Sequence, residues 1–258
     1  MHKKALMGIG VSLLVIFAVL MAGCVSTNDN VIVVGIDGEY PPYSYIDENG
    51  KAVGFDVESI QWIAEQKGFE VEIAPTAWDG IIPALLAGKI DMVYSGMSVT
   101  PEREAQVTFS NPYWEVNQGL VGKAGTTATV ADFEAGKLVI GVQRSCSADQ
   151  WMQDFFGMET YNQMVKDGKI KLYDSFPQSM VALEQGLVEC VIFDDVNIET
   201  YIKGNDAFQM IGIIETGEVY AIAMRNEDTD LHALINEGLA ELMASEKWEE
   251  LKLKYIVE

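Results

Sequence analysis

Short apolar runs alternate with amphipathic segments along the chain, and this order limits the fold more than any other feature. Apolar runs of about four to eight residues are typical of buried strands, whereas apolar residues at helical spacing are typical of helices. In the first half, such segments predict strand, helix, strand, helix and strand in turn: Val31–Ile36, Phe55–Lys67, Phe69–Ile73, Asp79–Ala87 and Ile90–Tyr94. Asp79 can cap the second helix, in which Pro83 is tolerated only if it lies in the first turn. The order is typical of a mostly parallel sheet flanked by helices.

The second half of the chain repeats this order. It predicts strands and helices at Leu138–Val142, Ser147–Phe156, Ile170–Tyr173, Pro177–Gln185 and Cys190–Phe193. The segments 84–93 and 182–191 even share one pattern, Ala-Leu-x-x-Gly-x-Ile/Val-Asp/Glu-x-Val, which describes a helix end, a glycine stop and a buried strand. The chain therefore predicts two lobes of similar α/β architecture.

Two lobes require crossings of the chain between them. Gln118–Gly122 and Thr216–Tyr220 are the candidates, because their glycines permit the backbone rotation of a hinge. Val219–Met224 predicts a last strand, and Thr229–Tyr255 has the pattern of a helical C-terminus. We expect lobe 1 to comprise residues 31–118 plus 221–258, and lobe 2 to comprise residues 119–220.

The N-terminus has the features of an export signal. Two lysines precede the apolar stretch Ala5–Met21, which is short for a membrane span and ends in small residues before Cys24. This resembles a lipoprotein signal, so we expect residues 1–23 to be removed, Cys24 to be acylated and residues 24–30 to form a tether. The alternative is an uncleaved membrane anchor with an incidental Cys24. Either interpretation predicts an extracytoplasmic body held at the cell membrane.

Composition excludes several function classes. The chain of 258 residues has 39 acidic and 17 basic residues, and its net charge of −22 argues against nucleic-acid binding. It has two histidines and three cysteines without a C-x-x-C pair, which excludes a multi-histidine metal site and a zinc ribbon. No phosphate-binding glycine motif is present. We therefore expect no cofactor and no metal.

Several motifs in order resemble the polar amino-acid-binding proteins of ABC importers, the bacterial extracellular solute-binding proteins of family 3. They cover about residues 31 to 255 and lie at Gly35–Tyr45, Gly54–Val57, Trp78–Leu85, Gly88–Asp91, Ser98–Arg103, Phe109–Tyr113 and Gly141–Gln143. The resemblance implies a two-lobed periplasmic-binding-protein fold of type II, each lobe a mixed, mostly parallel sheet flanked by helices. It also implies an amino-acid ligand between the lobes and an ABC permease as the partner.

Arg103 is the predicted partner of the ligand carboxylate. Thr100 can cap a short helix that begins at Pro101, which would place Arg103 beside a strand end. Guanidinium binds a carboxylate through two parallel hydrogen bonds, and the resemblance implies this role. The alternative is a surface arginine paired with Glu102 or Glu104.

Ser145, Cys146 and Ser147 follow a predicted strand and open a helix, whose free N–H groups favour an anion. Ser147 and Gln150 also have the spacing of a capping box. The family usually has Gly-Thr-Thr here, so the backbone donors remain while a threonine hydroxyl becomes a weaker thiol. Simple helix capping is the alternative.

The resemblance implies an aspartate against the ligand ammonium at Asp195. Asp194 is the alternative, because adjacent strand residues point to opposite faces, and either could instead cap the next helix.

The remaining candidates suit the ligand side chain. Asp37, Tyr40 and Trp78 combine one carboxylate with aromatic rings, which fits a basic or amide amino acid. Ser98 can bond near the carboxylate. Ordinary core packing is the alternative for the aromatic residues.

We expect a monomer that closes on its ligand, since neither lobe alone satisfies both ligand charges. The competing interpretations are a dehydratase resembling cyclohexadienyl dehydratase on the same fold, with Asp37 or Asp195 as general acid, and a ligand sensor that acts through a separate membrane protein.

Overall fold

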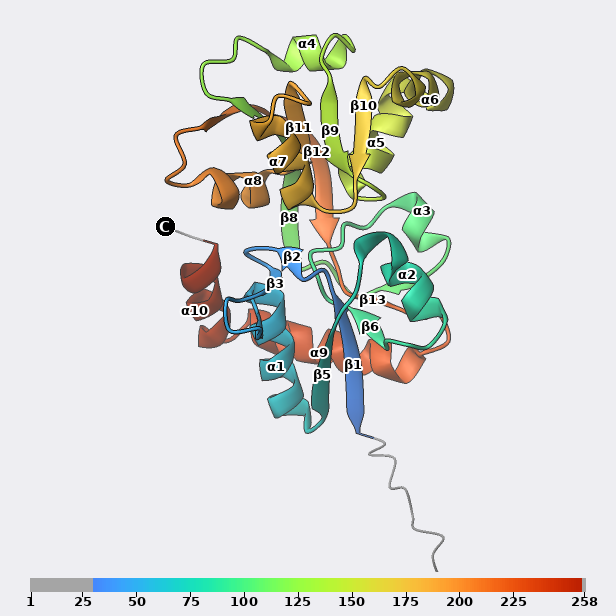
Figure 1. The fold of residues 1–258 in the computed structure, drawn as a ribbon. Coiled ribbons are helices and arrows are strands. Elements are labelled where there is room, and N and C mark those ends of the chain that lie inside the picture. The colour runs from blue at the N-terminus through green and yellow to red at the C-terminus, as the bar shows by residue number, and fades with distance from the viewer. Residues whose placement is uncertain (1–29, 257–258) are drawn as a thin grey trace, which may run out of the picture. The chain divides into compact units, whose positions relative to one another are not determined.

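The computed structural model describes residues 30–256 (Figure 1). The predicted signal peptide, the lipidation site Cys24 and most of the tether lie outside these residues. Within residues 30–256, no helix has the length and apolar character needed to cross a membrane.

The first lobe is built on a five-stranded sheet with the order β5-β1-β6-β13-β7. β1 pairs in parallel with β5 and β6, whereas β13 runs antiparallel to both of its neighbours. The strands are β1 (Val31–Ile36), β5 (Glu70–Pro75), β6 (Met92–Val93), β7 (Thr108–Phe109) and β13 (Ala223–Met224). This is the mixed, mostly parallel sheet that the alternation of apolar runs predicts.

Five helices and a small antiparallel sheet complete this lobe. The helices are α1 (Phe55–Lys67), α2 (Trp78–Leu86), α3 (Pro101–Glu104), α9 (Thr229–Met243) and α10 (Glu246–Tyr255). The small sheet comprises β2 (Glu39–Tyr40), β3 (Ser44–Ile46) and β4 (Ala52–Val53). The C-terminal helical stretch is thus two helices, the second of which starts after Ser245.

The second lobe has a sheet with the order β10-β9-β11-β8-β12, in which β10, β9 and β11 are parallel. Its strands are β8 (Trp114–Lys123), β9 (Ile140–Gln143), β10 (Ile170–Tyr173), β11 (Cys190–Asp194) and β12 (Phe208–Tyr220). Its helices are α4 (Val130–Glu134), α5 (Ser147–Phe156), α6 (Met158–Lys166), α7 (Phe176–Glu184) and α8 (Asp195–Ile202). The fold is therefore the two-lobed α/β architecture expected from the sequence.

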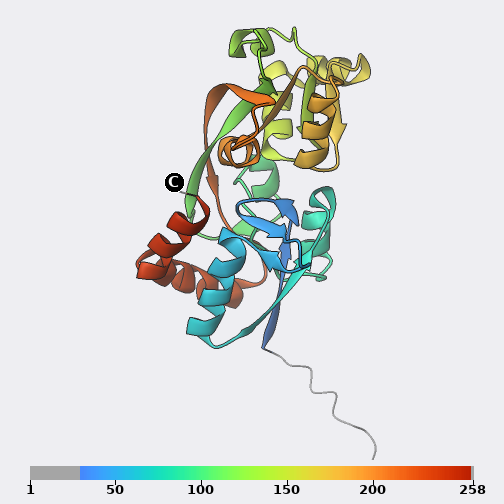
Figure 2. The same cartoon turned by 60° about the vertical axis from the view of Figure 1, so that its left-hand side comes forward.

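The two lobes are connected by β8 and β12, which pair antiparallel from Tyr220↔Trp114 to Phe208↔Lys123. Figure 2 shows the two strands running side by side from the second sheet down to the first. Both predicted crossings, Gln118–Gly122 and Thr216–Tyr220, lie within these strands.

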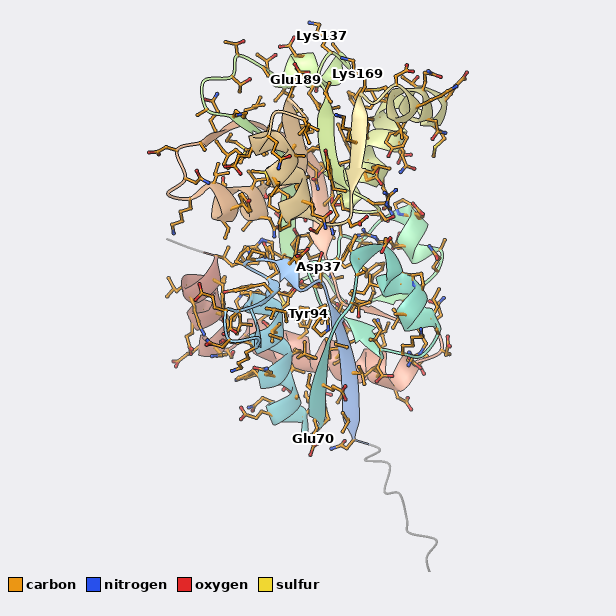
Figure 3. All side chains as sticks on the ribbon, in the orientation of Figure 1. Asp37, Glu70, Tyr94, Lys137, Lys169 and Glu189 are labelled. Atoms are coloured by element: carbon orange, nitrogen blue, oxygen red, sulfur yellow. The ribbon has the colours of Figure 1, made fainter. Side chains whose placement is uncertain are left out.

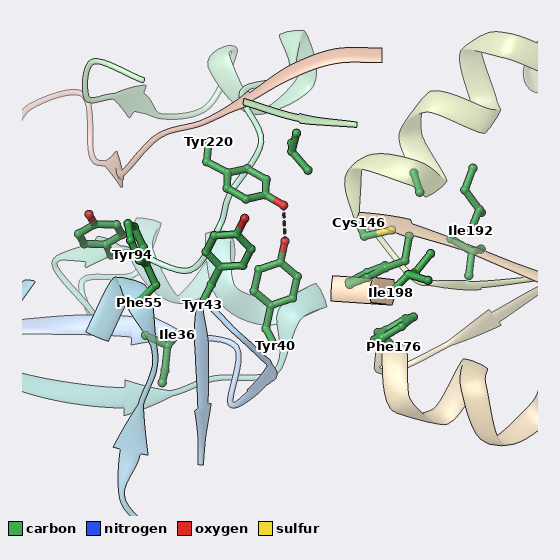
Figure 4. Close-up of a cluster of buried hydrophobic side chains, with 14 of the residues drawn as sticks. Ile36, Tyr40, Tyr43, Phe55, Tyr94, Cys146, Phe176, Ile192, Ile198 and Tyr220 are labelled. Carbon is green, nitrogen blue, oxygen red and sulfur yellow. Dashed lines mark hydrogen bonds between the residues drawn. The ribbon is translucent and has the colours of Figure 1, made fainter. Parts of the chain in front are cut away.

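A cluster of buried aromatic rings lies next to this connection (Figure 4). The Tyr43 ring stacks on Tyr40 at 5.6 Å between ring centroids and meets Tyr220 edge-on at 5.2 Å. Across from them, Phe176 and Phe193 of the second lobe stack at 4.4 Å. Such ring pairs add to the free energy gained from apolar burial and give the cleft between the lobes rigid walls.

The expectation for α2 is wrong in detail. The helix begins at Trp78, with Ala77 as its N-cap, so Asp79 lies within the first turn instead of capping it. Pro83 lies beyond the first turn, where its ring removes one backbone hydrogen bond. The acidic side chain of Asp79 still favours the positive end of the helix dipole.

The position of Gly54 before α1 requires a residue without a side chain, and this requirement can be tested. Its φ of 130° and ψ of 172° are accessible almost only to glycine, and a Cβ atom there would lie 2.2 Å from the Tyr43 carbonyl oxygen. We predict that Gly54→Ala lowers the free energy of unfolding by about 3 kcal/mol or more. The matched control is Gly50→Ala, because Gly50 also has a positive φ of 78° but has open space around it. It should lose only about 1 kcal/mol in the same urea titration, and equal losses would contradict the clash.

Candidate functional site

One small cavity lies where the carboxyl ends of the parallel strands of both sheets face each other. Figure 3 places Asp37 at this junction, far from Lys137, Lys169 and Glu189 at the outer end of the second lobe. The lining residues come from both lobes and are Asp37, Tyr40, Trp78, Gly96, Ser98, Arg103, Gln143, Cys146, Ser147, Phe193 and Asp194. This is the position at which open α/β sheets bind ligands.

Arg103 is held in the cavity by the short helix α3. The Thr100 side chain accepts a hydrogen bond from the Arg103 backbone N–H at 3.3 Å, and Pro101 occupies the first turn, as the sequence predicts. Although it is a long cationic side chain, Arg103 is only 2% exposed. Its location is therefore not that of the surface arginine considered as the alternative.

Two backbone carbonyls and one aromatic ring surround the Arg103 guanidinium. It donates to the Ser98 oxygen at 2.7 Å and to the Ser145 oxygen at 3.1 Å, and it lies 5.3 Å from the centre of the Trp78 ring. Burial lowers the pKa of Arg103, and the nearby Asp194 carboxylate opposes this shift. Among residues 30–256, no carboxylate forms an ion pair with Arg103. A buried guanidinium in this state is suited to receive an anion.

The turn from β9 into α5 differs from the expectation at Ser145. Its backbone N–H donates to Asp149 at 2.8 Å, so it is not a free donor for an anion. Its carbonyl instead accepts hydrogen bonds from Arg103 and from the Trp78 indole, each at 3.1 Å. Ser145 has a φ of 60° and is the one non-glycine residue with a positive φ in the described part of the chain. This fits the glycine that the family usually has there.

Cys146 and Ser147 line the cavity at the start of α5. Cys146 is the N-cap and makes no side-chain capping bond, so the expected capping box of Ser147 and Gln150 is not formed. Burial raises the pKa of the Cys146 thiol well above its usual range, which keeps it neutral. Both Cys146 and Cys190 are free thiols within residues 30–256.

A carboxylate also lines the cavity, and it belongs to Asp194 instead of Asp195. Asp194 is 5% exposed and accepts hydrogen bonds from the Tyr40 hydroxyl, from the Tyr220 hydroxyl at 2.9 Å and from the Gln118 amide at 2.7 Å. Burial and the nearby Glu218 carboxylate raise the pKa of Asp194 to about 6.

Asp195 begins α8 outside the cavity lining, and its carboxylate accepts from the Val196 N–H at 2.8 Å. The expected location of Asp195 is corrected because β11 continues through Asp194, one residue beyond the predicted strand end. One residue reverses the face to which a strand side chain points.

Asp37 also lines the cavity and is bonded across the lobes. One carboxylate oxygen accepts from the Glu39 N–H at 2.9 Å, and the other accepts from the Gln143 side-chain amide at 3.1 Å. Burial raises the pKa of Asp37. Gln143 carries no assigned role in the sequence analysis, although it ends the quoted motif Gly141–Gln143.

A further residue without a role in the sequence predictions is Asp56, which bonds to residues next to the cavity. Its carboxylate accepts from the Gly96 N–H at 2.6 Å and from the Tyr113 hydroxyl at 3.0 Å. Gly96 has a φ of 52°, and a Cβ atom there would lie 2.4 Å from the Tyr40 ring. Asp56 therefore holds the loop that brings Gly96 and Ser98 to the cavity.

No metal chemistry is indicated by the described residues. Within residues 30–256, no three His, Cys, Asp or Glu side chains converge as metal ligands. The described histidine, His232, shares a hydrogen bond of 2.9 Å with the Phe109 carbonyl, and neither residue lines the cavity. The cavity groups are thus suited to hold a charged organic molecule by hydrogen bonds and ion pairs.

Two relatives of known function are similar to this chain over most of its length. The L-cystine-binding protein TcyJ of Escherichia coli is 29% identical over 228 residues, which covers 84% of this chain and 82% of that protein. The L-arginine-binding protein of Pseudomonas aeruginosa is 29% identical over 238 residues, which covers 88% of each.

Solved structures agree with this similarity. An ancestral arginine-binding protein bound to arginine is 34% identical with a TM-score of 0.78, covering 88% of this chain and 98% of that one. The same kind of protein bound to glutamine is 33% identical with a TM-score of 0.79, covering 89% and 99%. The family model of bacterial extracellular solute-binding proteins, family 3, matches residues 32–258. The chain therefore belongs to the bacterial extracellular solute-binding proteins of family 3.

Proposed function

We propose that the protein captures one amino acid with a basic or amide side chain between its lobes and delivers it to an ABC permease. One observation carries this proposal. The cavity holds a buried cation, Arg103, and two buried carboxylates, Asp37 and Asp194, and within residues 30–256 none of the three forms an ion pair. A buried charge without an opposite charge beside it is unfavourable. We infer that the ligand supplies the opposite charges.

The three charges in the cavity are complementary in sign to the charged and polar groups of an amino acid. Arg103 would bind the α-carboxylate, with the backbone N–H of Ser147 at the start of α5 beside it. Asp194 would bind the α-ammonium, together with the Tyr40 hydroxyl. Asp37 would then be left for the ligand side chain, which therefore has to be a cation or a hydrogen-bond donor such as an amide. Similarity to a structure bound to arginine supports a cationic side chain, and similarity to one bound to glutamine supports an amide.

Ligand capture would favour the closed arrangement of the lobes. Arg103 and Asp37 belong to lobe 1 (31–118 plus 221–258), whereas Asp194 and Ser147 belong to lobe 2 (119–220). A ligand that contacts both sets binds the closed form more tightly, and this difference in affinity shifts the population. Direct bonds between the lobes assist closure, such as the one from the Asn197 amide to the Pro41 carbonyl at 2.6 Å.

The location and partners follow from the same proposal. Acylation of Cys24 would hold the body at the outer face of the cell membrane, where a monomer can present its ligand to the permease. We propose binding without turnover, so prephenate and arogenate should remain intact on incubation with the protein. Conversion of either would support the dehydratase alternative.

The ligand class can be tested with a thermal-shift panel of the standard amino acids and L-cystine on the full chain. We predict that L-arginine, L-lysine, L-histidine or L-glutamine raises the melting temperature by about 10 °C at a thousandfold excess over its dissociation constant. L-Aspartate and L-glutamate should have no effect, since they would place a carboxylate against Asp37. A flat response to the whole panel would contradict the proposed function.

Arg103 can be tested against a matched arginine. We predict that Arg103→Ala weakens binding at least about a hundredfold, because a buried ligand carboxylate would lose its charge partner. Arg103→Lys should recover part of the affinity, since a charge remains without the bidentate geometry. Arg144→Ala serves as the control, because the Arg144 side chain is 44% exposed and lies outside the cavity lining. Isothermal titration calorimetry measures all three, and equal affinities for Arg103→Ala and Arg144→Ala would remove Arg103 from the site.

The two neighbouring aspartates allow a test with the same chemical change. We predict that Asp194→Asn weakens binding by about a hundredfold or more, because the ammonium would lose a buried carboxylate. Asp195→Asn should change the dissociation constant less than about threefold, because Asp195 bonds the start of α8. The opposite order in calorimetry would restore Asp195 as the ammonium partner.

A further inference from the structure

Two carboxylates share one amide group at the ammonium end of the cavity. Gln118, fully buried on β8, donates through its side-chain nitrogen to Asp194 at 2.7 Å and to Glu218 at 3.2 Å. The same nitrogen lies 3.2 Å from the Ser147 hydroxyl oxygen. The Gln118 amide nitrogen carries two hydrogens, so it can donate one to each carboxylate. If the amide were turned over, its oxygen would face two other acceptors.

The fold brings Glu218 to this position through an irregularity in β12. The pairing with β8 shifts register between Ile214 and Glu218, and Gly217 within the shift has a φ of 66°. Bulges of this kind redirect side chains and occur next to functional sites. After the bulge, one Glu218 carboxylate oxygen faces Gln118, and the other is buried without a hydrogen-bond partner among the described residues.

The surroundings of Asp194 are mostly neutral or acidic. Its ionisable neighbours come from every element packed against it and are Tyr40, Tyr43, Arg103, Cys146, Glu218 and Tyr220. Arg103 is the one cation in this group, and it is not within ion-pair distance of Asp194. Glu218 is the neighbouring carboxylate that raises the pKa of Asp194, after burial itself.

We propose that Glu218, acting through the Gln118 amide, makes Asp194 a proton-dependent anchor for the ligand ammonium, so that acidification weakens amino-acid binding. The inference rests on the proposed function and adds a regulation of the same site. Glu218 does not line the cavity and is therefore a positioning residue: it does not contact the ligand, and it changes the charge state of the group that does.

The direction of the effect follows from which form of Asp194 binds. Ionised Asp194 attracts an ammonium, whereas protonated Asp194 does not. Because the pKa of Asp194 is about 6, affinity falls as the pH drops through this value, and the loss approaches tenfold per pH unit well below it. Glu218→Gln removes the like charge but keeps an oxygen that accepts from Gln118. The pKa of Asp194 should then fall, and binding should persist at lower pH.

The first experiment needs no ligand. The carboxyl carbon of Asp194 is followed by NMR in the full chain during a pH titration, and its signal is assigned by its loss in Asp194→Asn. We expect a midpoint near 6 in the unaltered protein and a midpoint at least about half a unit lower in Glu218→Gln. Glu215→Gln is the matched control, since it removes the same charge from an exposed position of β12 and should leave the midpoint unchanged. Coinciding midpoints for Glu218→Gln and the unaltered protein would overturn the proposal.

The second experiment measures dissociation constants of L-arginine and L-glutamine by calorimetry between about pH 5 and 8, where neither side chain titrates. The raised pKa of Asp37 adds its own pH dependence, so the comparison is between variants. We expect the acid-induced loss of affinity to move to lower pH in Glu218→Gln and to stay in place in Glu215→Gln. If the NMR midpoint shifts in Glu218→Gln but the pH dependence of the dissociation constant does not, the proposed effect on binding is overturned. Absence of any binding at pH 8 would instead refute the proposed function, and the regulation with it, while the NMR titration still decides whether Glu218 controls the charge of Asp194.

Discussion

The burial of Arg103 without an ion pair to any carboxylate of residues 30–256 is the constraint on which the rest of the site depends. A guanidinium removed from water needs several acceptors, and here the Ser98 and Ser145 carbonyls and the face of Trp78 supply only part of them. The cap at Thr100 and the following proline keep the side chain from turning back to solvent. The molecule therefore maintains a charged donor in its interior whose natural complement is a ligand.

The same constraint explains why the site requires both lobes. Ser145 belongs to the second lobe, yet its carbonyl accepts from Arg103 and Trp78 of the first. Asp37 and Gln143 form a second pair across the cavity, and Tyr40 and Asp194 form a third. These pairs join the two lobes, so they can form only when the lobes are close together. Approach of the lobes therefore depends on hydrogen bonds between them. In the proposed function, a bound amino acid would add charges opposite to those of the cavity side chains.

Local chemistry made much of the structure predictable. α1 spans the expected residues because its apolar spacing and the glycine at its end point to the same helix, and Arg103 is located by the Thr-Pro cap. The choice between Asp194 and Asp195 depended on a strand that ends one residue later than its apolar run. The role of Ser145 was hidden because its carbonyl, not its N–H, faces the neighbouring lobe. Propensity and spacing describe single elements, whereas these two features arise from how elements meet.

Gln118 and Glu218 show most clearly what a sequence pattern cannot locate. Both lie in the predicted crossings, but the sequence does not show that they meet, and they are 100 residues apart along the chain. They meet because β8 and β12 pair and because a bulge with Gly217 turns Glu218 toward Gln118. Since both strands also carry the chain between the lobes, Asp194 is hydrogen-bonded directly to side chains of the connection, Gln118 on β8 and Tyr220 on β12. A change in the charge of Asp194 would therefore act on the ligand and on the hinge at the same time.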